Sequence, residues 1–342
     1  MSRAQLTSTV EQNTGGAVSP YVAGKNIMIN GGMDIWQRGT SFTGSGAYVY
    51  TTDRWQGFLA STYSITQIDV SSLVSNFQWG ARGQRASGQT TTNYFNLEQG
   101  LETKTILPLR GNVVTVSFWA RCGANFSPTS SQLGVAFFCG TGTERVRNVT
   151  AFTSETTPIN TNATLTTTYQ KFTFTSTAIP TTTTQAALTF SAYPTGTAGA
   201  NDWFEVTGVQ LEIGSVATPF SRAGGTLSGE LAACQRYYYR TSQNLAYTCF
   251  TGSSAASSST QAFNLPIWLP VQMRVAPTSI DFSSLRVTDG YAAANSVSNV
   301  TIDGNSANIV NVDITSSSLT TGRPVTLQSN GTSGYLGFSA EL

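Results

Sequence analysis

Histidine is absent from the sequence, and this absence removes the usual general base of serine and cysteine hydrolases. Cysteine is scarce. Cys122, Cys139, Cys234 and Cys249 form no CxxC pair, so a Cys/His zinc site is excluded and a site made of cysteine alone is disfavoured. Each cysteine lies in an apolar or aromatic run. The pattern predicts buried free thiols, with a disulfide within a pair as the alternative.

Charged side chains are also few. They make up 10% of the 342 residues, against roughly 25% in a typical soluble protein, and the formal net charge is +1. Because no basic excess exists to neutralise phosphates, nucleic-acid binding is disfavoured. Hydrophobic residues at 39% and aromatic residues at 11% argue for a folded chain whose polarity comes from Ser, Thr, Asn, Gln and Gly.

Long apolar runs are missing as well. No stretch of 18 apolar residues occurs, which predicts that nothing spans a membrane. Residues 1–16 lack the basic-then-apolar pattern of a secretory signal peptide. We therefore expect a protein that is made and assembled without Sec export.

The remaining absences concern catalysis. The sequence contains no Walker loop, dinucleotide-binding loop or EF-hand, and no motif pairs two of its acidic residues for glycoside hydrolysis. A Ser–Lys dyad stays open, although Lys25, Lys104 and Lys171 lie in no recognisable motif. A calcium ion held by acids and carbonyls also stays open, without a motif to support it. We predict a protein that is not an enzyme, with no catalytic residue, cofactor or metal site.

What the sequence does contain is a series of short runs rich in Val, Phe, Tyr and Thr, separated by turn residues. These runs cover 63–70, 93–102, 112–120, 133–139, 169–175, 186–192 and 203–213. Many short strands without an intervening helical pattern predict an all-β fold. Their number fits an antiparallel jelly-roll β-sandwich over residues 26–222.

The segment 209–222, VQLEIGSVATPFSR, forms the predicted end of this domain. Val209, Leu211 and Ile213 alternate with polar residues, which predicts a half-buried strand. A Gly-Ser pair ends the strand, and a proline in the strap that follows bars a return to the sheet interior. We expect Glu212 to order this strap or to meet Arg222.

The pattern changes after residue 222. Thr226 can cap a helix, and Leu227, Leu231 and Cys234 follow at helical spacing. Short runs punctuated by Ser, Asn and Gly come next, at 297–302, 309–314, 325–328 and 335–339. Residues 223–342 are therefore predicted to form a second, smaller β-sandwich-like domain.

The N-terminal residues 1–25 are polar and hold too few large apolar residues to fold alone. This composition predicts an extended arm that orders on a partner. Its candidate anchors are Val10, Val18, Tyr21 and Val22.

Aromatic residues on strands are the best candidates for binding, because a sugar ring can stack on an aromatic face. The candidate glycan-stacking residues are Trp79, Tyr94, Trp119 and Trp203, each with packing in the core or an interface as the alternative. The word RYYYR supplies candidates for a subunit interface, where tyrosine is enriched: Tyr237, Tyr238 and Tyr239.

Several of these words resemble a known family when they are taken together. NGGMDIWQRGTSF, TTDRW, NYFNLEQGLE, VSFWAR, VQLEIGSVATPFSR, ACQRYYYR and LPVQMRVAPT follow one another between residues 26 and about 280. In this order they resemble the virion fibre proteins of tailed phages, including phages of cyanobacteria. The resemblance implies a carbohydrate-binding-module-like jelly roll, a second β domain and a symmetric assembly, most often a trimer.

The resemblance also implies a place on the virion. The favoured interpretation is a tail or side fibre, assembled in the host cytoplasm and exposed on the particle surface. Its N-terminal arm would dock on other virion proteins, and the fibre would contact host surface glycan. The alternatives are a head fibre or capsid decoration protein with a mainly structural role and, less favoured, a polysaccharide depolymerase. No nucleic acid or membrane is expected as a partner.

Overall fold

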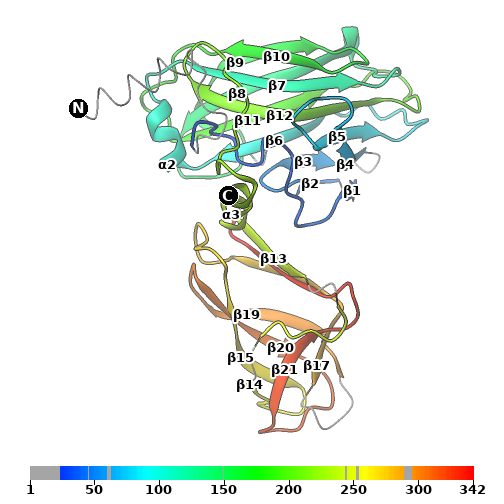
Figure 1. Cartoon of the computed structure of the whole chain (residues 1–342), viewed down its shortest axis with the longest axis vertical. Helices are drawn as coiled ribbons and strands as arrows, with labels where there is room; N and C mark the ends of the chain where they lie inside the picture. Colours follow the sequence, from blue (N-terminus) through cyan, green and yellow to red (C-terminus); the bar gives the residue numbers. More distant parts are fainter. Residues whose placement is uncertain are drawn as a thin grey trace. The chain divides into compact units, whose positions relative to one another are not determined.

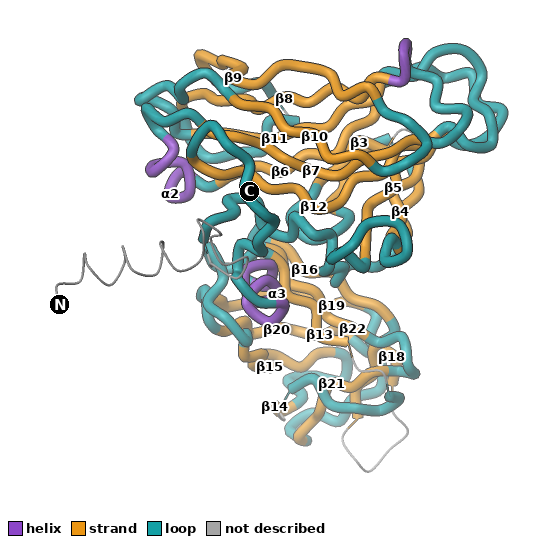
Figure 2. Tube along the Cα trace, turned by 45° about the horizontal axis from the view of Figure 1, so that its top comes forward, coloured by secondary structure: helices purple, strands orange, loops and turns teal. Residues whose placement is uncertain are grey.

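The computed structural model describes residues 24–44, 46–59, 63–148, 150–242, 245–251, 254–288 and 295–342. Contacts between Cα atoms divide the chain into two compact units, one ending at Leu231 and joined by Leu342, the other spanning residues 232–341. Strands dominate both units (Figure 1, Figure 2), which confirms the predicted all-β fold. The candidate docking residues of the N-terminal arm, Val10, Val18, Tyr21 and Val22, lie outside the described residues.

The first unit consists of two six-stranded antiparallel sheets. The first sheet contains, in spatial order, β1 (Ser41–Thr43), β4 (Tyr63–Asp69), β5 (Trp79–Arg85), β12 (Trp203–Ile213), β7 (Val114–Cys122) and β10 (Gln170–Thr175). The second sheet contains β2 (Ala47–Tyr50), β3 (Gln56–Leu59), β6 (Phe95–Leu101), β11 (Gln185–Ala192), β8 (Gln132–Thr141) and β9 (Thr153–Thr164). Figure 1 shows the strands of the two sheets stacked over one another.

The two sheets enclose one hydrophobic core. Phe118 of β7 packs edge-on against Phe190 of β11, with ring centroids 4.8 Å apart. Phe95 of β6 packs against Phe204 of β12 at 5.2 Å. Because these ring pairs join strands of different sheets, the sheets pack face to face, and the predicted antiparallel jelly-roll sandwich is confirmed.

The strands predicted for this unit are all present. They are β4, β6, β7, β8, β10, β11 and β12, with ends that lie within a few residues of the predicted ones. The sequence pattern does not predict β1, β2, β3, β5 or β9.

Two distinctive segments of the sequence lie side by side: the one that begins NIMINGGMDIW and the one that begins VQLEIG. β5 pairs with the first half of β12, and residues 26–31 take its place beside the second half. The Ile27 amide donates to the Leu211 carbonyl, and the Val209 amide donates to the Gly31 carbonyl, both at 2.8 Å. Glycine is required at position 31, because a Cβ there would come within 2.0 Å of the Val209 carbonyl oxygen.

The strap after β12 is held by the carboxylate of Glu212, which lies near the end of the strand. Glu212 accepts hydrogen bonds from the Thr218 amide at 2.8 Å and from its hydroxyl at 2.6 Å, which confirms that Glu212 orders the strap. Arg222 pairs instead with Asp34 at 2.8 Å, and so joins the strap to the NGGMDIW word. Ile213 ends the strand and is 48% exposed, so the alternation predicted for this strand places only Val209 and Leu211 in the core.

Helices are few among the described residues: α2 (Thr103–Ile106), α3 (Leu227–Gln235) and the 3-10 turns η1 (Leu107–Leu109) and η2 (Thr129–Ser131). The Thr226 hydroxyl accepts from the Gly229 amide at 3.0 Å, which confirms the predicted N-cap of α3. Leu227 is 54% exposed, however, and does not belong to an apolar stripe. The buried Glu230 of α3 accepts from the amides of Asn30 and Gly224, which anchors the helix to the NGG turn.

The second unit packs three small sheets around one core. The first contains β13 (Tyr238–Ser242), β22 (Tyr335–Ser339) and β16 (Ser279–Ser283). The second contains β14 (Ser254–Ala255), β21 (Pro324–Ser329), β17 (Leu285–Thr288) and β18 (Asn295–Ser296). The third contains β15 (Gln261–Trp268), β20 (Ile309–Thr315) and β19 (Asn299–Asn305). All four runs predicted here form strands, namely β19, β20, β21 and β22.

All four cysteines are free thiols. Cys122, Cys139 and Cys234 are buried as predicted, and Cys249 is exposed, so the expectation is wrong for one of the four. Within the described residues, no helix combines the length and the apolar character that a membrane crossing requires.

Candidate functional site

The outer face of the first sheet, on the side away from the core, carries a network around Glu205 of β12. The Glu205 carboxylate pairs with Arg82 and Arg121, and the Tyr169 hydroxyl donates to it at 2.9 Å. Both guanidinium groups lie against the Trp203 ring, at 4.4 Å for Arg82 and 5.3 Å for Arg121. Burial beside Glu205 raises the pKa of Tyr169 above its usual value.

Three of the candidate glycan-stacking residues lie on this sheet, and none of them presents a fully open ring. Trp203 is only 9% exposed because the two guanidinium groups cover it, so it offers no open face to a sugar. Trp79 begins β5 and is half-buried, and its carbonyl accepts from the Thr207 hydroxyl at 2.7 Å. Trp119 is also half-buried and packs beside the small cluster formed by Val70, Val74 and Phe77.

The outer face of the second sheet holds the fourth candidate, Tyr94, within a row of four rings. We call Tyr48, Phe58, Tyr94 and Tyr193 the aromatic row. Phe58 and Tyr94 are stacked with centroids 5.8 Å apart, and Tyr94 and Tyr193 are stacked at 5.9 Å. The Tyr48 and Tyr94 hydroxyls share a hydrogen bond of 2.8 Å. Tyr94 is 36% and Tyr193 is 63% exposed, so the row presents ring surface to solvent.

Small and amide side chains lie beside the aromatic row. The strand register places Asn96 of β6 opposite Ser191 of β11, Ser191 opposite Gly134 of β8, and Gly134 opposite Asn162 of β9. The Asn96 amide oxygen accepts from the Phe58 amide at 3.0 Å, which fixes this side chain against the aromatic row. A glycine and a serine at the centre leave room for a ligand to approach the sheet.

The next row across the sheet contains Gln56, Glu98 and Thr189, which lie opposite one another in the register. Glu98 is 2% exposed, and it accepts from the Thr189 hydroxyl at 2.8 Å and from the Asn148 amide at 3.2 Å. Burial raises the pKa of the Glu98 carboxyl to about 7, against the lowering effect of these hydrogen bonds and of Arg147. Glu98 therefore changes charge near neutral pH.

The β8–β9 loop reaches over the far end of this face. The Asn148 side chain accepts from the Asn96 amide at 2.8 Å and donates to the Gln56 amide oxygen at 3.3 Å. Arg147 forms a two-pronged ion pair with Glu155 at 3.0 Å and lies over the Phe138 ring at 3.3 Å. The loop thus closes over Asn96 and Gln56, which are 2% and 8% exposed, and leaves the aromatic rings open at the other end of the face.

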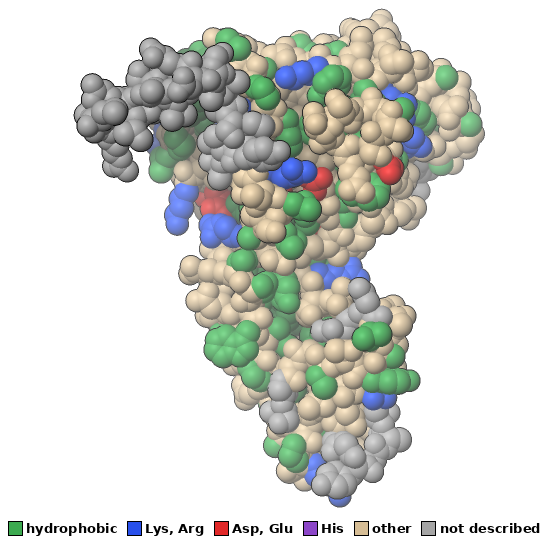
Figure 3. Space-filling model, in the orientation of Figure 1, with side chains coloured by type: hydrophobic (Ala, Val, Ile, Leu, Met, Phe, Trp, Pro, Cys, Tyr) green, Lys and Arg blue, Asp and Glu red, His purple; other side chains and the backbone are tan. Residues whose placement is uncertain are grey.

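This arrangement is suited to an uncharged, hydroxyl-rich ligand. Aromatic faces accept the apolar side of a sugar ring, while amides and hydroxyls donate and accept at its hydroxyl groups. A buried carboxyl such as Glu98 cannot reach a glycosidic oxygen outside the sheet. Few acidic or basic side chains are visible on the side of the molecule drawn in Figure 3.

The three candidate interface tyrosines begin the second unit. Tyr237 and Tyr238 are 3% and 2% exposed, and the Tyr238 hydroxyl donates to the Asp281 carboxylate at 3.1 Å. Tyr239 is half-buried and lines a hollow beside Trp268, which is 74% exposed. Of the three rings, Tyr239 retains the surface that a second chain could contact.

Sequence reasoning finds Tyr94 but misses its neighbours. Tyr193 follows β11, and Tyr48 and Phe58 lie on strands that the sequence pattern does not single out. Asn96 and Glu98 do lie within a predicted strand. Their alternation with Phe95 and Leu97 was the available signal that they share a face with Tyr94.

Metal binding finds no support in the part of the chain that is described, where no cluster of three His, Cys, Asp or Glu side chains could hold an ion. No family model matches the sequence, and no curated protein matches it.

Solved structures do align with part of the chain. An enzymatically active domain of tailspike protein 4 of bacteriophage CBA120 aligns with 15% identity and a TM-score of 0.34, over 57% of this chain and 22% of its own. The CBM22-1 xylan-binding domain of Paenibacillus barcinonensis Xyn10C aligns with 12% identity and a TM-score of 0.33, over 57% of this chain and 98% of its own. A cyclase from Fischerella sp. TAU aligns with 13% identity and a TM-score of 0.38, over 56% and 98%. These similarities are too low to transfer a function.

Proposed function

We propose that this protein is a phage virion fibre that binds host surface glycan through the outer face of its second sheet. The aromatic row carries the proposal. It places the exposed rings of Tyr94 and Tyr193 on one sheet beside small residues and the exposed amide of Asn162, and this combination suits a neutral sugar chain. The sparse charge of the whole sequence supports the same interpretation.

The place on a virion is supported by the order of the sequence words, from NGGMDIWQRGTSF to LPVQMRVAPT. In this proposal the N-terminal arm docks on other virion proteins, and the fibre assembles as a homotrimer in the host cytoplasm. Several copies would make weak binding at each site useful, because linked sites raise avidity without new contacts. The protein acts by binding and has no catalytic role.

Binding of host oligosaccharides on a glycan array, followed by calorimetry, tests the glycan proposal. The double variant Tyr94→Ala, Tyr193→Ala should weaken binding by roughly ten-fold or more, because each aromatic contact contributes about 0.5–1.5 kcal/mol. Tyr247→Ala is a matched control, since Tyr247 is a 57% exposed tyrosine of the second unit. Equal binding by the double variant and the wild type would refute this face as the site.

Antibody labelling of virions in the electron microscope tests the location. Label on the tail supports a tail or side fibre, and label on capsid faces supports a head fibre instead. An assay for reducing sugar tests the binding-only role. Release of reducing ends from host polysaccharide by the purified protein would contradict it.

A further inference from the structure

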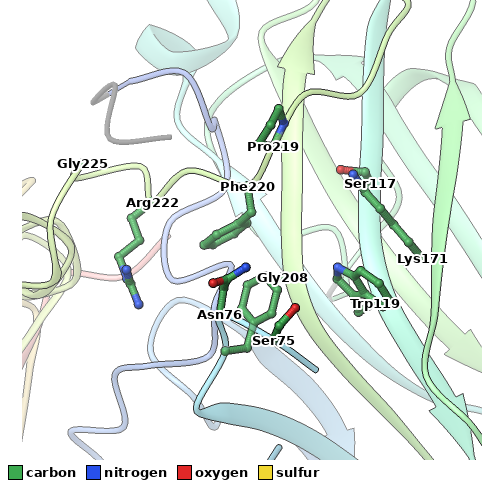
Figure 4. A pocket seen from close by; sticks show the side chains of 11 residues that line it. Ser75, Asn76, Ser117, Trp119, Lys171, Gly208, Pro219, Phe220, Arg222 and Gly225 are labelled. Atoms are coloured by element: carbon green, nitrogen blue, oxygen red, sulfur yellow. The ribbon is translucent and has the colours of Figure 1, made fainter. Parts of the chain in front are cut away.

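A cavity of about 480 Å³ lies on the outer face of the first sheet, and none of its lining residues belongs to the aromatic row. Its lining includes Ser117 and Trp119 of β7 and Lys171 of β10, with Phe77 and Phe220 from the loops that cover this face. Figure 4 shows Ser117, Trp119 and Lys171 together on neighbouring strands, with Phe220 across from them.

A bulge in β12 helps to form the cavity. The register of β12 against β7 shifts between Thr207 and Gln210, and Gly208 within the bulge has a φ of +62°. The Phe77 ring packs so closely there that a Cβ on Gly208 would lie 2.5 Å from it. Phe77 in turn meets Phe220 edge-on, with centroids 4.9 Å apart, and the two rings make an apolar wall.

The charge of the lining is positive. Among the described residues, no carboxylate forms an ion pair with Lys171, whose side chain is exposed. The other cation at the cavity, Arg222, is paired with Asp34 at 2.8 Å. The lining contains no Asp or Glu. An anionic group would therefore be attracted to the Lys171 ammonium.

We propose that this cavity binds a carboxylated monosaccharide unit, such as a hexuronic acid of a host polysaccharide. The Lys171 ammonium binds the carboxylate. Trp119, directly opposite Lys171 in the strand register, packs against the sugar ring, and the Ser117 hydroxyl and Asn76 amide bind its hydroxyls. The inference rests on the proposed glycan binding but uses none of the residues of the aromatic row.

Titration of the full-length protein with glucuronate and with glucose, followed by saturation-transfer NMR and calorimetry, tests the proposal. Glucuronate should bind and glucose should bind at least ten-fold more weakly. Lys171→Gln should weaken glucuronate binding at least ten-fold, and raising the NaCl concentration should weaken it in the wild type. Lys104→Gln, which alters an exposed lysine of α2, is the matched control and should bind as the wild type does.

Three results would overturn the proposal. Undiminished binding by Lys171→Gln would show that the cation is not used. Competition by inorganic sulfate as strong as that of glucuronate itself would show a simple anion site. Loss of glucuronate binding in Tyr94→Ala, Tyr193→Ala would move the ligand to the aromatic row. If that double variant instead loses neutral glycans and keeps glucuronate, the two sites are independent.

Discussion

The buried carboxyl of Glu98 makes the free energy of unfolding depend on pH. Burial penalises the charged form and raises the pKa of the Glu98 carboxyl from its ordinary 4.5 to about 7 in the folded protein. The folded state therefore holds a proton that the unfolded state releases. The stabilisation is fully present below pH 4.5 and is lost as the pH rises through 7, by up to about 3 kcal/mol.

Thermal unfolding of the wild type and of Glu98→Gln between pH 5 and pH 8 measures this effect. We expect the wild type to lose roughly 6–12 °C in Tm relative to Glu98→Gln across this range. Asp69→Asn is the control, since Asp69 is an exposed acid whose pKa is lowered by hydrogen bonds from Ser71. Parallel curves for wild type and Glu98→Gln would show that Glu98 is charged throughout.

The identity of the site residues follows from sequence only in part. Alternation along a strand says that Tyr94, Asn96 and Glu98 share a face. It does not say which strands lie beside them, and Tyr193 joins Tyr94 only through the register of β11 against β6. For the same reason, sequence alone predicts Trp203 as a glycan-stacking residue. The two arginines that cover its ring come from strands that are distant in the sequence.

Two of the strands that sequence reasoning misses, β9 and β5, have physical explanations. β9, TSETTPINTNAT, is polar and contains Pro158, which an edge strand tolerates because one side of its backbone stays unpaired. β5, WGARGQR, ends in Arg85, which is fully buried. Its guanidinium pairs with Asp202 at 3.1 Å and donates to the carbonyls of Gln89 and Gly196. An arginine in the sequence suggests an exposed position, and only the structure shows the partners that allow Arg85 to be buried.

The bulge of β12 supports a prediction at the level of the element. Gly208→Ala should lower the free energy of unfolding by about 2–4 kcal/mol, because it adds a clash with Phe77 to the cost of a positive φ. Gly88→Ala measures the cost of a positive φ alone, since Gly88 has a φ of +80° and open space around it. We expect this variant to lower the free energy of unfolding by only about 1 kcal/mol.

Urea unfolding of both glycine variants makes the comparison. Equal losses would mean that the ring of Phe77 moves aside freely. In that case Phe77 is not a fixed wall of the cavity beside Lys171.

At the scale of the whole molecule, the two proposed sites bind different kinds of sugar, one neutral and the other acidic. The aromatic row uses uncharged groups, and the cavity uses one cation in a chain whose formal net charge is +1. Salt should therefore leave the first kind of binding unchanged and weaken the second. A glycan that carries both neutral and acidic sugars would be bound by two faces of one unit, on opposite sides of its sandwich.

The N-terminal arm can be separated from these sites experimentally. The first unit has its own core, built from residues between Met28 and Leu211, so removing residues 1–20 should leave it folded and able to bind glycan. We expect the truncated protein to stay oligomeric and to be missing from assembled virions. Complementation of a phage that lacks the gene, followed by blotting of purified particles, measures incorporation. Glycan binding by the truncated protein is the control for its folding. If the truncated protein binds glycan and is still incorporated, then the anchor lies in one of the two β units, and Val10, Val18, Tyr21 and Val22 do not dock it.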